Sequence, residues 1–154
     1  MTISAMTFTV QDAVSLARTA HEGQVDKSGK PYIGHPLRVM AAMTDDRGRM
    51  AAVLHDVVED TDVTADDLRA AGCPAEVVDA VIALSHLGGE PQEDYLRRVA
   101  ANPLAVRVKR ADIADNSSPH RLADLDEPTR LRLTEKYRRA VALLDGLAPA
   151  VPPA

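Results

Sequence analysis

Residues 50–61 read Met-Ala-Ala-Val-Leu-His-Asp-Val-Val-Glu-Asp-Thr, an apolar run that holds two pairs of ionisable residues. A run of apolar helix formers of this kind predicts a buried helix over residues 50–58, closed by the pair Glu59-Asp60. His55 and Asp56 lie inside the predicted helix, where ionisable side chains are costly to bury unless each has a partner. Hydrogen bonds to neighbouring groups would satisfy them as a structural pair. A divalent metal ion would satisfy both at once.

The rest of the chain shows helical spacing of apolar residues and no sustained alternation of apolar and polar residues. We therefore expect an all-α fold, a compact orthogonal bundle of roughly seven or eight helices. The segment 22–32 is rich in glycine, proline and charged residues and predicts an exposed loop. Further helices are expected at residues 10–20, 36–43, 64–72, 74–84, 91–100, 103–114 and 128–147.

Length and composition set the class of protein. The chain has 154 residues, which predicts one domain over residues 1–148 and a flexible Pro/Ala tail over 149–154. A formal net charge of -5 argues against a nucleic-acid partner, because such proteins usually present a basic face. The sequence has a single cysteine, Cys73, so neither a disulfide nor a thiolate metal site forms within one chain. With no leader or membrane-spanning run in the sequence, we expect a cytoplasmic protein without a membrane partner.

Two more residues are candidates to join His55 and Asp56 around a metal. His35 stands between Gly34 and Pro36 at a predicted helix start, although a His-Pro pair also occurs there for backbone reasons. Asp112 interrupts a segment that begins apolar, and a solvated helix face is the alternative. Two histidines and two aspartates make a mixed nitrogen and oxygen ligand set. Such a set suits Mn²⁺ or Fe²⁺, and zinc is a further option.

The carboxylates of Glu59 and Asp60 follow one helical turn after the His-Asp pair. Glu59 lies at i+4 from His55 and Asp60 at i+4 from Asp56, so both are expected to stand over the metal. A metal ion lowers the pKa of its bound water, and a nearby carboxylate can orient that water or exchange protons with it. This combination is typical of phosphoester hydrolysis.

Three blocks of the sequence support a family assignment: Ala20-His-Glu-Gly-Gln-Val-Asp-Lys-Ser-Gly-Lys-Pro-Tyr-Ile-Gly-His-Pro36, Leu54-His-Asp-Val-Val-Glu-Asp-Thr61 and Val108-Lys-Arg-Ala-Asp-Ile-Ala-Asp-Asn116. In this order they resemble the HD-domain phosphohydrolase superfamily, and more closely the hydrolase domain of Rel/SpoT-type alarmone enzymes and their small single-domain relatives. The similarity covers residues 10–147. The family's fold is all-α, in agreement with the helical pattern.

The resemblance implies roles for particular residues and a small nucleotide substrate. It implies Mn²⁺ as the usual metal and removal of the 3′-pyrophosphate from (p)ppGpp as the reaction. The implied metal ligands are His35, His55, Asp56 and Asp112, and the implied catalytic pair is Glu59 and Asp60. The implied substrate-binding residues are Lys27, Ser28 and Asn116. Arg110 is added to this group because it flanks an expected ligand and offers bidentate geometry to phosphate.

Departures from the family pattern bear on the substrate. Asp26 replaces an arginine that stacks on the guanine base in alarmone hydrolases, Asp115 stands where a histidine is common, and Pro119 replaces a substrate-contacting threonine. Two other functions therefore remain open. One is hydrolysis of another nucleotide or phosphomonoester, such as NADPH. The other is a nucleotide-sensing HD protein without catalysis, which the Glu59-Asp60 pair disfavours. Lys30, Lys109 and Arg121 are further basic residues that could meet phosphates, and of these Lys30 and Arg121 are expected to be solvated surface charges.

Overall fold

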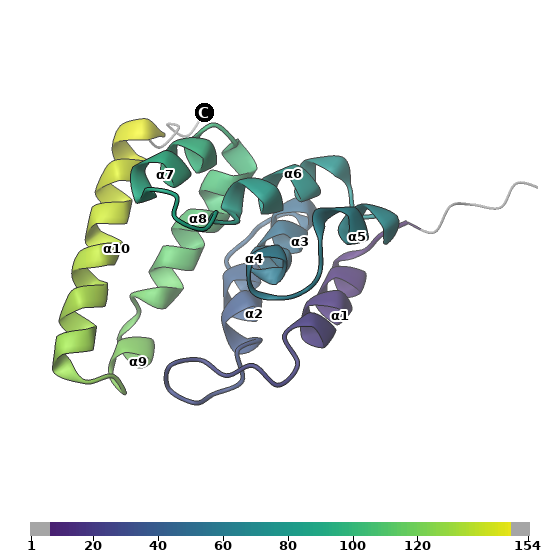
Figure 1. The fold of residues 1–154 in the computed structure, drawn as a ribbon. Coiled ribbons are helices and arrows are strands. Elements are labelled where there is room, and N and C mark those ends of the chain that lie inside the picture. The colour runs from purple at the N-terminus through teal and green to yellow at the C-terminus, as the bar shows by residue number, and fades with distance from the viewer. Residues whose placement is uncertain (1–6, 149–154) are drawn as a thin grey trace, which may run out of the picture.

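The computed structural model describes residues 7–148, and within this range the regular structure is entirely helical, as predicted (Figure 1). The expected Pro/Ala tail, residues 149–154, lies outside the described residues. The helices are α1 (Val10–Ala20), α2 (Gly34–Ala41), α3 (Asp46–Leu54), α4 (Val57–Asp60), α5 (Ala65–Ala70), α6 (Ala75–Leu84), α7 (Gln92–Ala100), α8 (Pro103–Asn116), α9 (Pro119–Leu122) and α10 (Glu127–Leu147).

The short helix α3 lies at the centre of the bundle. It packs against α1, α2, α6 and α8, and α10 covers the opposite side of α7 and α8 (Figure 1). Every residue of α3 from Met50 to Leu54 is buried, which is why this run is apolar. Burying apolar area of this kind is the main favourable contribution to folding, at about 25 cal/mol per Å² removed from water.

Side-chain caps fix where several helices begin. Thr9 and Thr64 each form a capping box with an aspartate three residues later, at the starts of α1 and α5. Asp45, Asn102 and Asp126 accept a hydrogen bond from a backbone amide in the first turn of α3, α8 and α10. Each such cap satisfies a backbone donor that the helix itself leaves free. The predicted starts of α1, α5, α8 and α10 agree with the structure to within one residue, whereas that of α3 does not.

The predicted continuous helix over residues 50–58 is wrong in one respect: it is divided at His55-Asp56. The helix begins earlier, at Asp46, and ends at Leu54, and α4 starts only at Val57. The reason lies in the Ala52 carbonyl, which would accept from the Asp56 amide in an unbroken α-helix. Here His55 takes that carbonyl, through its backbone amide at 3.4 Å and its ring Nδ1 at 2.6 Å. The break turns His55 and Asp56 toward the site described below.

Two smaller differences concern helix bounds. Helix α2 begins at Gly34, so that Pro36 lies within its first turn, where its missing amide hydrogen leaves no hydrogen bond unmade. The short helix α9 was not predicted, and it begins with Pro119 directly after Ser118. The segment 22–32 is a loop as expected, tied by one isolated bridge between Val25 and Pro31.

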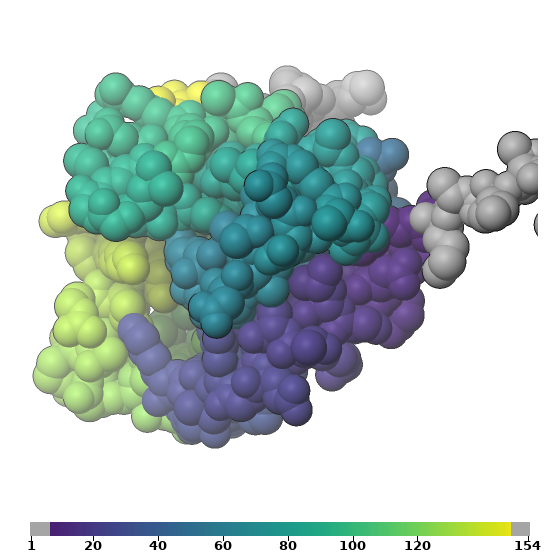
Figure 2. Space-filling model, turned by 45° about the vertical axis from the view of Figure 1, so that its right-hand side comes forward, coloured from purple at the N-terminus to yellow at the C-terminus, as the bar shows by residue number. Residues whose placement is uncertain are grey.

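The surface is hollowed where the C-terminal helices, yellow-green in Figure 2, face the blue N-terminal half. Two adjoining clefts, lined by residues from both halves, lie in this region. Cys73, the single cysteine, is buried and free. Within residues 7–148 no helix combines the length and the apolar character needed to cross a membrane.

Candidate active site

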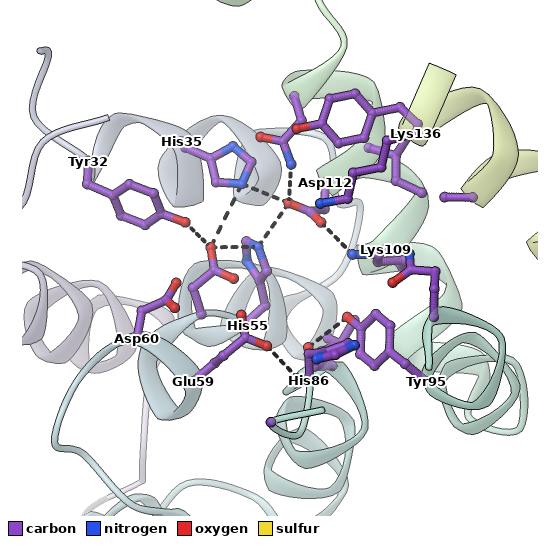
Figure 3. A pocket seen from close by; sticks show the side chains of 18 residues that line it. Tyr32, His35, His55, Glu59, Asp60, His86, Tyr95, Lys109, Asp112 and Lys136 are labelled. Atoms are coloured by element: carbon purple, nitrogen blue, oxygen red, sulfur yellow. Dashed lines mark hydrogen bonds and ion pairs between the residues drawn. The ribbon is translucent and has the colours of Figure 1, made fainter. Parts of the chain in front are cut away.

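Four side chains from three parts of the fold meet at one point of the larger cleft (Figure 3). His35 comes from α2, His55 and Asp56 from the α3–α4 junction, and Asp112 from α8. The Oδ1 atom of Asp112 lies 2.8 Å from His35 Nε2 and 3.2 Å from His55 Nε2. The Oδ2 atom of Asp56 lies 3.1 Å from His55 Nε2 and 3.9 Å from His35 Nε2. The sequence-predicted ligand set is thus brought together.

The donor atoms fit a metal ion. The Nδ1 atoms of both rings have acceptors of their own: Ala52 O lies 2.6 Å from His55 Nδ1, and Asp115 Oδ2 lies 2.7 Å from His35 Nδ1. With a proton on Nδ1, a neutral ring presents a bare Nε2 lone pair toward the carboxylate oxygens. Lone pairs that face one another at these distances require a cation between them, either protons or a metal. The chain therefore holds a His/Asp cluster of the kind that binds a divalent metal.

The charged groups of the cluster change one another's pKa values. Burial opposes the charged form of His55, but Asp56 and Asp112 raise its pKa well above the ordinary histidine value. Burial likewise opposes the charge on Asp112, but the ammonium of Lys109 and the ring of His55 hold the pKa of that carboxyl well below its usual range. Anionic carboxylates that stay ionised in a buried place are what a cation requires of its ligands.

Glu59 and Asp60 line the same cleft, next to the ligand cluster. Oxygen atoms of Asp56, Glu59 and Asp60 lie within 4.8 Å of one another. The carboxylate of Glu59 accepts a hydrogen bond from the His86 amide, which fixes its direction. Burial, and then the negative charges of Asp56 and Glu59, raise the pKa of Asp60 to about 6. A carboxyl with such a pKa can exchange protons near neutral pH.

Two residues of the site were not predicted to belong to it. The hydroxyl of Tyr32 donates to Asp56 Oδ2, so that this tyrosine orients an expected ligand. Its sequence signal is weak, since Tyr32 belongs to a segment expected to be an exposed loop. Lys109 was noted only as one of several basic residues. Its side chain is half-buried, and its ammonium group lies 3.1 Å from Asp112 Oδ2 and over the Tyr95 ring.

The two clefts share the side chains of Tyr32, Asn116 and Tyr137. The larger, of about 500 Å³, contains the ligand cluster, and the smaller, of about 240 Å³, adjoins it. Lys27 and Ser28 line the smaller cleft, and Asn116 lies at the boundary, where its amide donates to Asp112 Oδ1. Three of the expected substrate-binding residues therefore line the smaller cleft, which shares part of its wall with the cleft that contains the ligand cluster.

The structure does not bring Arg110 to either cleft. Its guanidinium pairs with Asp145 at 2.6 Å and donates to the Ala148 carbonyl, which directs it to the end of α10. Adjacent residues on a helix point about 100° apart, so only Lys109 of the pair faces the cleft. The expectation for Arg121 also needs correction: its side chain is 15% exposed, lines the smaller cleft and contacts Asp115 and Asn116.

A helical bundle that gathers two histidines and two aspartates from separate helices into a buried cluster defines a class of metal-binding α proteins. The sequence profile of the HD domain matches residues 13–125, and the chain belongs to this family. A solved structure of a metazoan ortholog of SpoT, described as hydrolysing ppGpp, covers 95% of this chain, and 90% of its own length is matched. Its TM-score is 0.75 at 24% sequence identity, which shows the shared fold.

Relatives in bacteria include longer proteins. The chain is 38% identical over 128 residues to a guanosine-3′,5′-bis(diphosphate) 3′-pyrophosphohydrolase of Vibrio cholerae, covering 76% of this chain and 18% of the relative. It is 33% identical over 134 residues to the bifunctional (p)ppGpp synthase/hydrolase SpoT of Escherichia coli, covering 80% and 19%. A GTP pyrophosphokinase of Streptomyces coelicolor is 34% identical over 119 residues, covering 70% and 14%. The chain thus spans a fifth or less of the length of these relatives.

Proposed function

We propose that this HD-domain chain is a metal-dependent hydrolase of nucleotide phosphoesters, with removal of the 3′-pyrophosphate from (p)ppGpp as the named candidate reaction. One observation carries the proposal: His35, His55, Asp56 and Asp112 converge in the same cleft as the carboxylates of Glu59 and Asp60. The names of the relatives favour (p)ppGpp as the substrate. The same proposal includes a small nucleotide as substrate and a cytoplasmic location. It includes neither a nucleic-acid partner nor a membrane partner.

The metal of this proposal is Mn²⁺, held by the two imidazoles and the two aspartates. A divalent ion bound there would supply a water of lowered pKa and neutralise phosphate charge. Manganese accepts both imidazole and carboxylate ligands, as the mixed donor set of this site offers them. The choice of Mn²⁺ over Fe²⁺ or Zn²⁺ rests on the family resemblance.

The remaining residues of the cleft have distinct tasks in this reaction. Asp60, with a pKa of about 6, is ionised at neutral pH and accepts a proton from the attacking water. Glu59, fixed by the His86 amide, orients that water. Lys109, whose ammonium pairs with Asp112, presents its positive charge to the phosphate that is attacked. Lys27, Ser28 and Asn116 bind the nucleoside side of the substrate in the smaller cleft.

One observation favours a different nucleotide as substrate. Asp26 lines the smaller cleft, and its Oδ1 accepts hydrogen bonds from the amides of Ser28 at 2.8 Å and Lys30 at 3.0 Å. Asp26 therefore shapes the loop, and its carboxylate brings no cation on which a guanine base could stack. Hydrolysis of NADPH or another phosphomonoester is the second candidate. A sensor without catalysis is disfavoured, since Glu59 and Asp60 both line the cleft beside the ligands.

The deciding experiment is a hydrolysis assay of the purified chain with Mn²⁺ against ppGpp, pppGpp, NADPH, GTP and ATP. We expect release of pyrophosphate from ppGpp, abolition of that release in His55→Ala and a large decrease of its rate in Asp60→Asn. His120→Ala is the matched control, because His120 is exposed on α9 and lies outside both clefts. Turnover of NADPH alone would select the second candidate, and no turnover of any compound would reject hydrolysis.

A further inference from the structure

The metal-candidate ligand His35 has two polar neighbours at its Nδ1 atom that make opposite demands. Asp115 Oδ2 lies 2.7 Å from Nδ1, and the NH1 atom of Arg121 lies 2.9 Å from it. A carboxylate accepts a hydrogen bond, so it requires a proton on Nδ1. A guanidinium donates only, so it requires Nδ1 to be bare. A neutral ring can satisfy one of these neighbours at a time.

The choice at Nδ1 decides what the other ring nitrogen can do. When Nδ1 carries the proton and donates to Asp115, Nε2 is bare and its lone pair points at the cluster, 2.8 Å from Asp112 Oδ1. When Nδ1 accepts from Arg121, the neutral ring carries its proton on Nε2 and cannot bind a metal. Asp115 and Arg121 therefore favour the ligating and the non-ligating tautomer of His35, respectively.

The structure gives Asp115 the stronger hold on the ring. Its contact with Nδ1 is shorter, and its second oxygen, Oδ1, accepts from Arg38 Nε at 2.8 Å, which fixes the carboxylate from behind. The Asp115 side chain is only 10% exposed, so water competes little for it. Arg121, in contrast, has other acceptors within reach, the side-chain oxygens of Asn116 and Asp115. A charge-assisted bond from a shielded, doubly held carboxylate outweighs a donor with alternative partners.

We propose that Asp115 is a positioning residue that holds His35 in its metal-ligating tautomer against the competing guanidinium of Arg121. This inference rests on the metal site of the proposed function and adds a determinant of its affinity. It also gives a role to the aspartate that stands where a histidine is common in alarmone hydrolases. Residues that orient a ligating histidine through its second nitrogen typically contribute about 10- to 100-fold to metal affinity.

The test measures Mn²⁺ affinity in solution, by calorimetry and by the EPR signal of free Mn²⁺, with no substrate present. We expect Asp115→Ala to weaken binding by about 10- to 100-fold, as for other second-nitrogen partners. Asp115→Asn should weaken it less, because the amide oxygen still accepts from Nδ1 and the shape is kept. Asp79→Ala is the matched control, since Asp79 is exposed on α6. Circular dichroism and thermal melting establish that each variant is folded.

A double variant separates tautomer selection from a merely structural role. In Asp115→Ala, Arg121 is the one of the two neighbours that remains at His35 Nδ1, and it stabilises the non-ligating tautomer of His35. Removing it as well, in Asp115→Ala/Arg121→Ala, should restore part of the lost Mn²⁺ affinity. A purely structural role predicts the opposite, because two deletions in one buried network weaken it further. Equal or weaker Mn²⁺ binding in the double variant, or an Asp115→Ala affinity equal to that of the wild type, would overturn the inference.

The failure of this inference is distinct from the failure of the proposed function. If the wild type binds one Mn²⁺ but hydrolyses none of the nucleotides, the proposed reaction is rejected while the affinity series still decides the role of Asp115. If the wild type hydrolyses ppGpp and all Asp115 variants bind Mn²⁺ equally, the function stands and the positioning role is rejected. If the wild type binds no Mn²⁺, both are rejected.

Discussion

Asp112 Oδ1 lies 3.2 Å from His55 Nε2, although the two residues are 57 positions apart in the chain. The contact joins the α3–α4 junction to α8 and places a carboxylate between the rings of two histidines, since the same oxygen lies 2.8 Å from His35 Nε2. Replacing His55 by alanine removes one donor of this arrangement. We expect His55→Ala to lose stoichiometric Mn²⁺ binding, measured by elemental analysis after exposure to Mn²⁺ and gel filtration. His120→Ala should bind as the wild type does, and a His55→Ala protein with a full complement of metal would refute the ligand assignment.

Asp60→Asn tests the proton acceptor. The amide cannot take a proton from water, so kcat should fall by about 10²- to 10⁴-fold while the Mn²⁺ content stays near that of the wild type. Steady-state kinetics with ppGpp, together with elemental analysis, provide the two measurements. A kcat within a few-fold of the wild type would move the role to Glu59, for which Glu59→Gln is the parallel variant.

Asp60→Asn, which should lower activity, should raise the stability of the metal-free protein. Burial and neighbouring carboxylates raise the pKa of Asp60 to about 6 in the fold, compared with about 3.9 in an unfolded chain. Between about pH 4 and 6 the folded state binds more protons, so stability falls as the pH rises through this interval. Asp60→Asn removes the repelled charge and should raise Tm above pH 7, with a gain that shrinks toward pH 4. Asp62→Asn, at an exposed aspartate nearby, is the matched control. A pH-independent difference would contradict the prediction.

Lys109 and Arg110 offer a test of which neighbouring cation serves the site. Lys109 pairs with Asp112 and lines the cleft, whereas Arg110 pairs with Asp145 outside it. Lys109→Met should lower kcat/KM by about 10²-fold or more, the usual loss for one group that stabilises transition-state charge. Arg110→Ala should change kcat/KM by less than about twofold, since partly exposed ion pairs contribute little. If Arg110→Ala lowered kcat/KM more than Lys109→Met, the sequence-based expectation that Arg110 binds the substrate would stand instead.

Asp45 is predicted to stabilise the helix that leads to the site. Its carboxylate accepts from the Gly48 amide at the start of α3 and pairs with Arg107 of α8. Loss of such a cap costs about 1 kcal/mol, so Asp45→Ala should lower the free energy of unfolding by this amount at pH 7 in urea titrations. The Gly48 amide and then Arg107 lower the pKa of Asp45 in the fold. Its contribution is therefore present above the unfolded pKa of about 3.9 and is lost as the pH falls through the lower folded value, so the difference between the two proteins should shrink as the pH falls below about 3.9.

The sequence predicted the parts of this molecule that depend on local chemistry. The apolar run 50–54 identified the central helix, the helices expected at residues 10–20 and 64–72 are present as α1 and α5, and the glycine-rich segment 22–32 is a loop. Caps, turns and amphipathic spacing act within a few residues, which makes them readable without a structure.

Contacts between distant elements were decided only by the tertiary structure. The break at His55-Asp56 depends on a ring that captures the Ala52 carbonyl, and the position of Lys109 rather than Arg110 depends on which face of α8 meets the cleft. Tyr32 and Asp115 reach the site because the loop and α8 pack beside α2. By itself, the sequence determined an all-α chain with a candidate set of ligands. Packing decided how Asp56 and both histidines face Asp112, and which neighbours hold them, because the direction of a side chain is fixed by the elements packed around it.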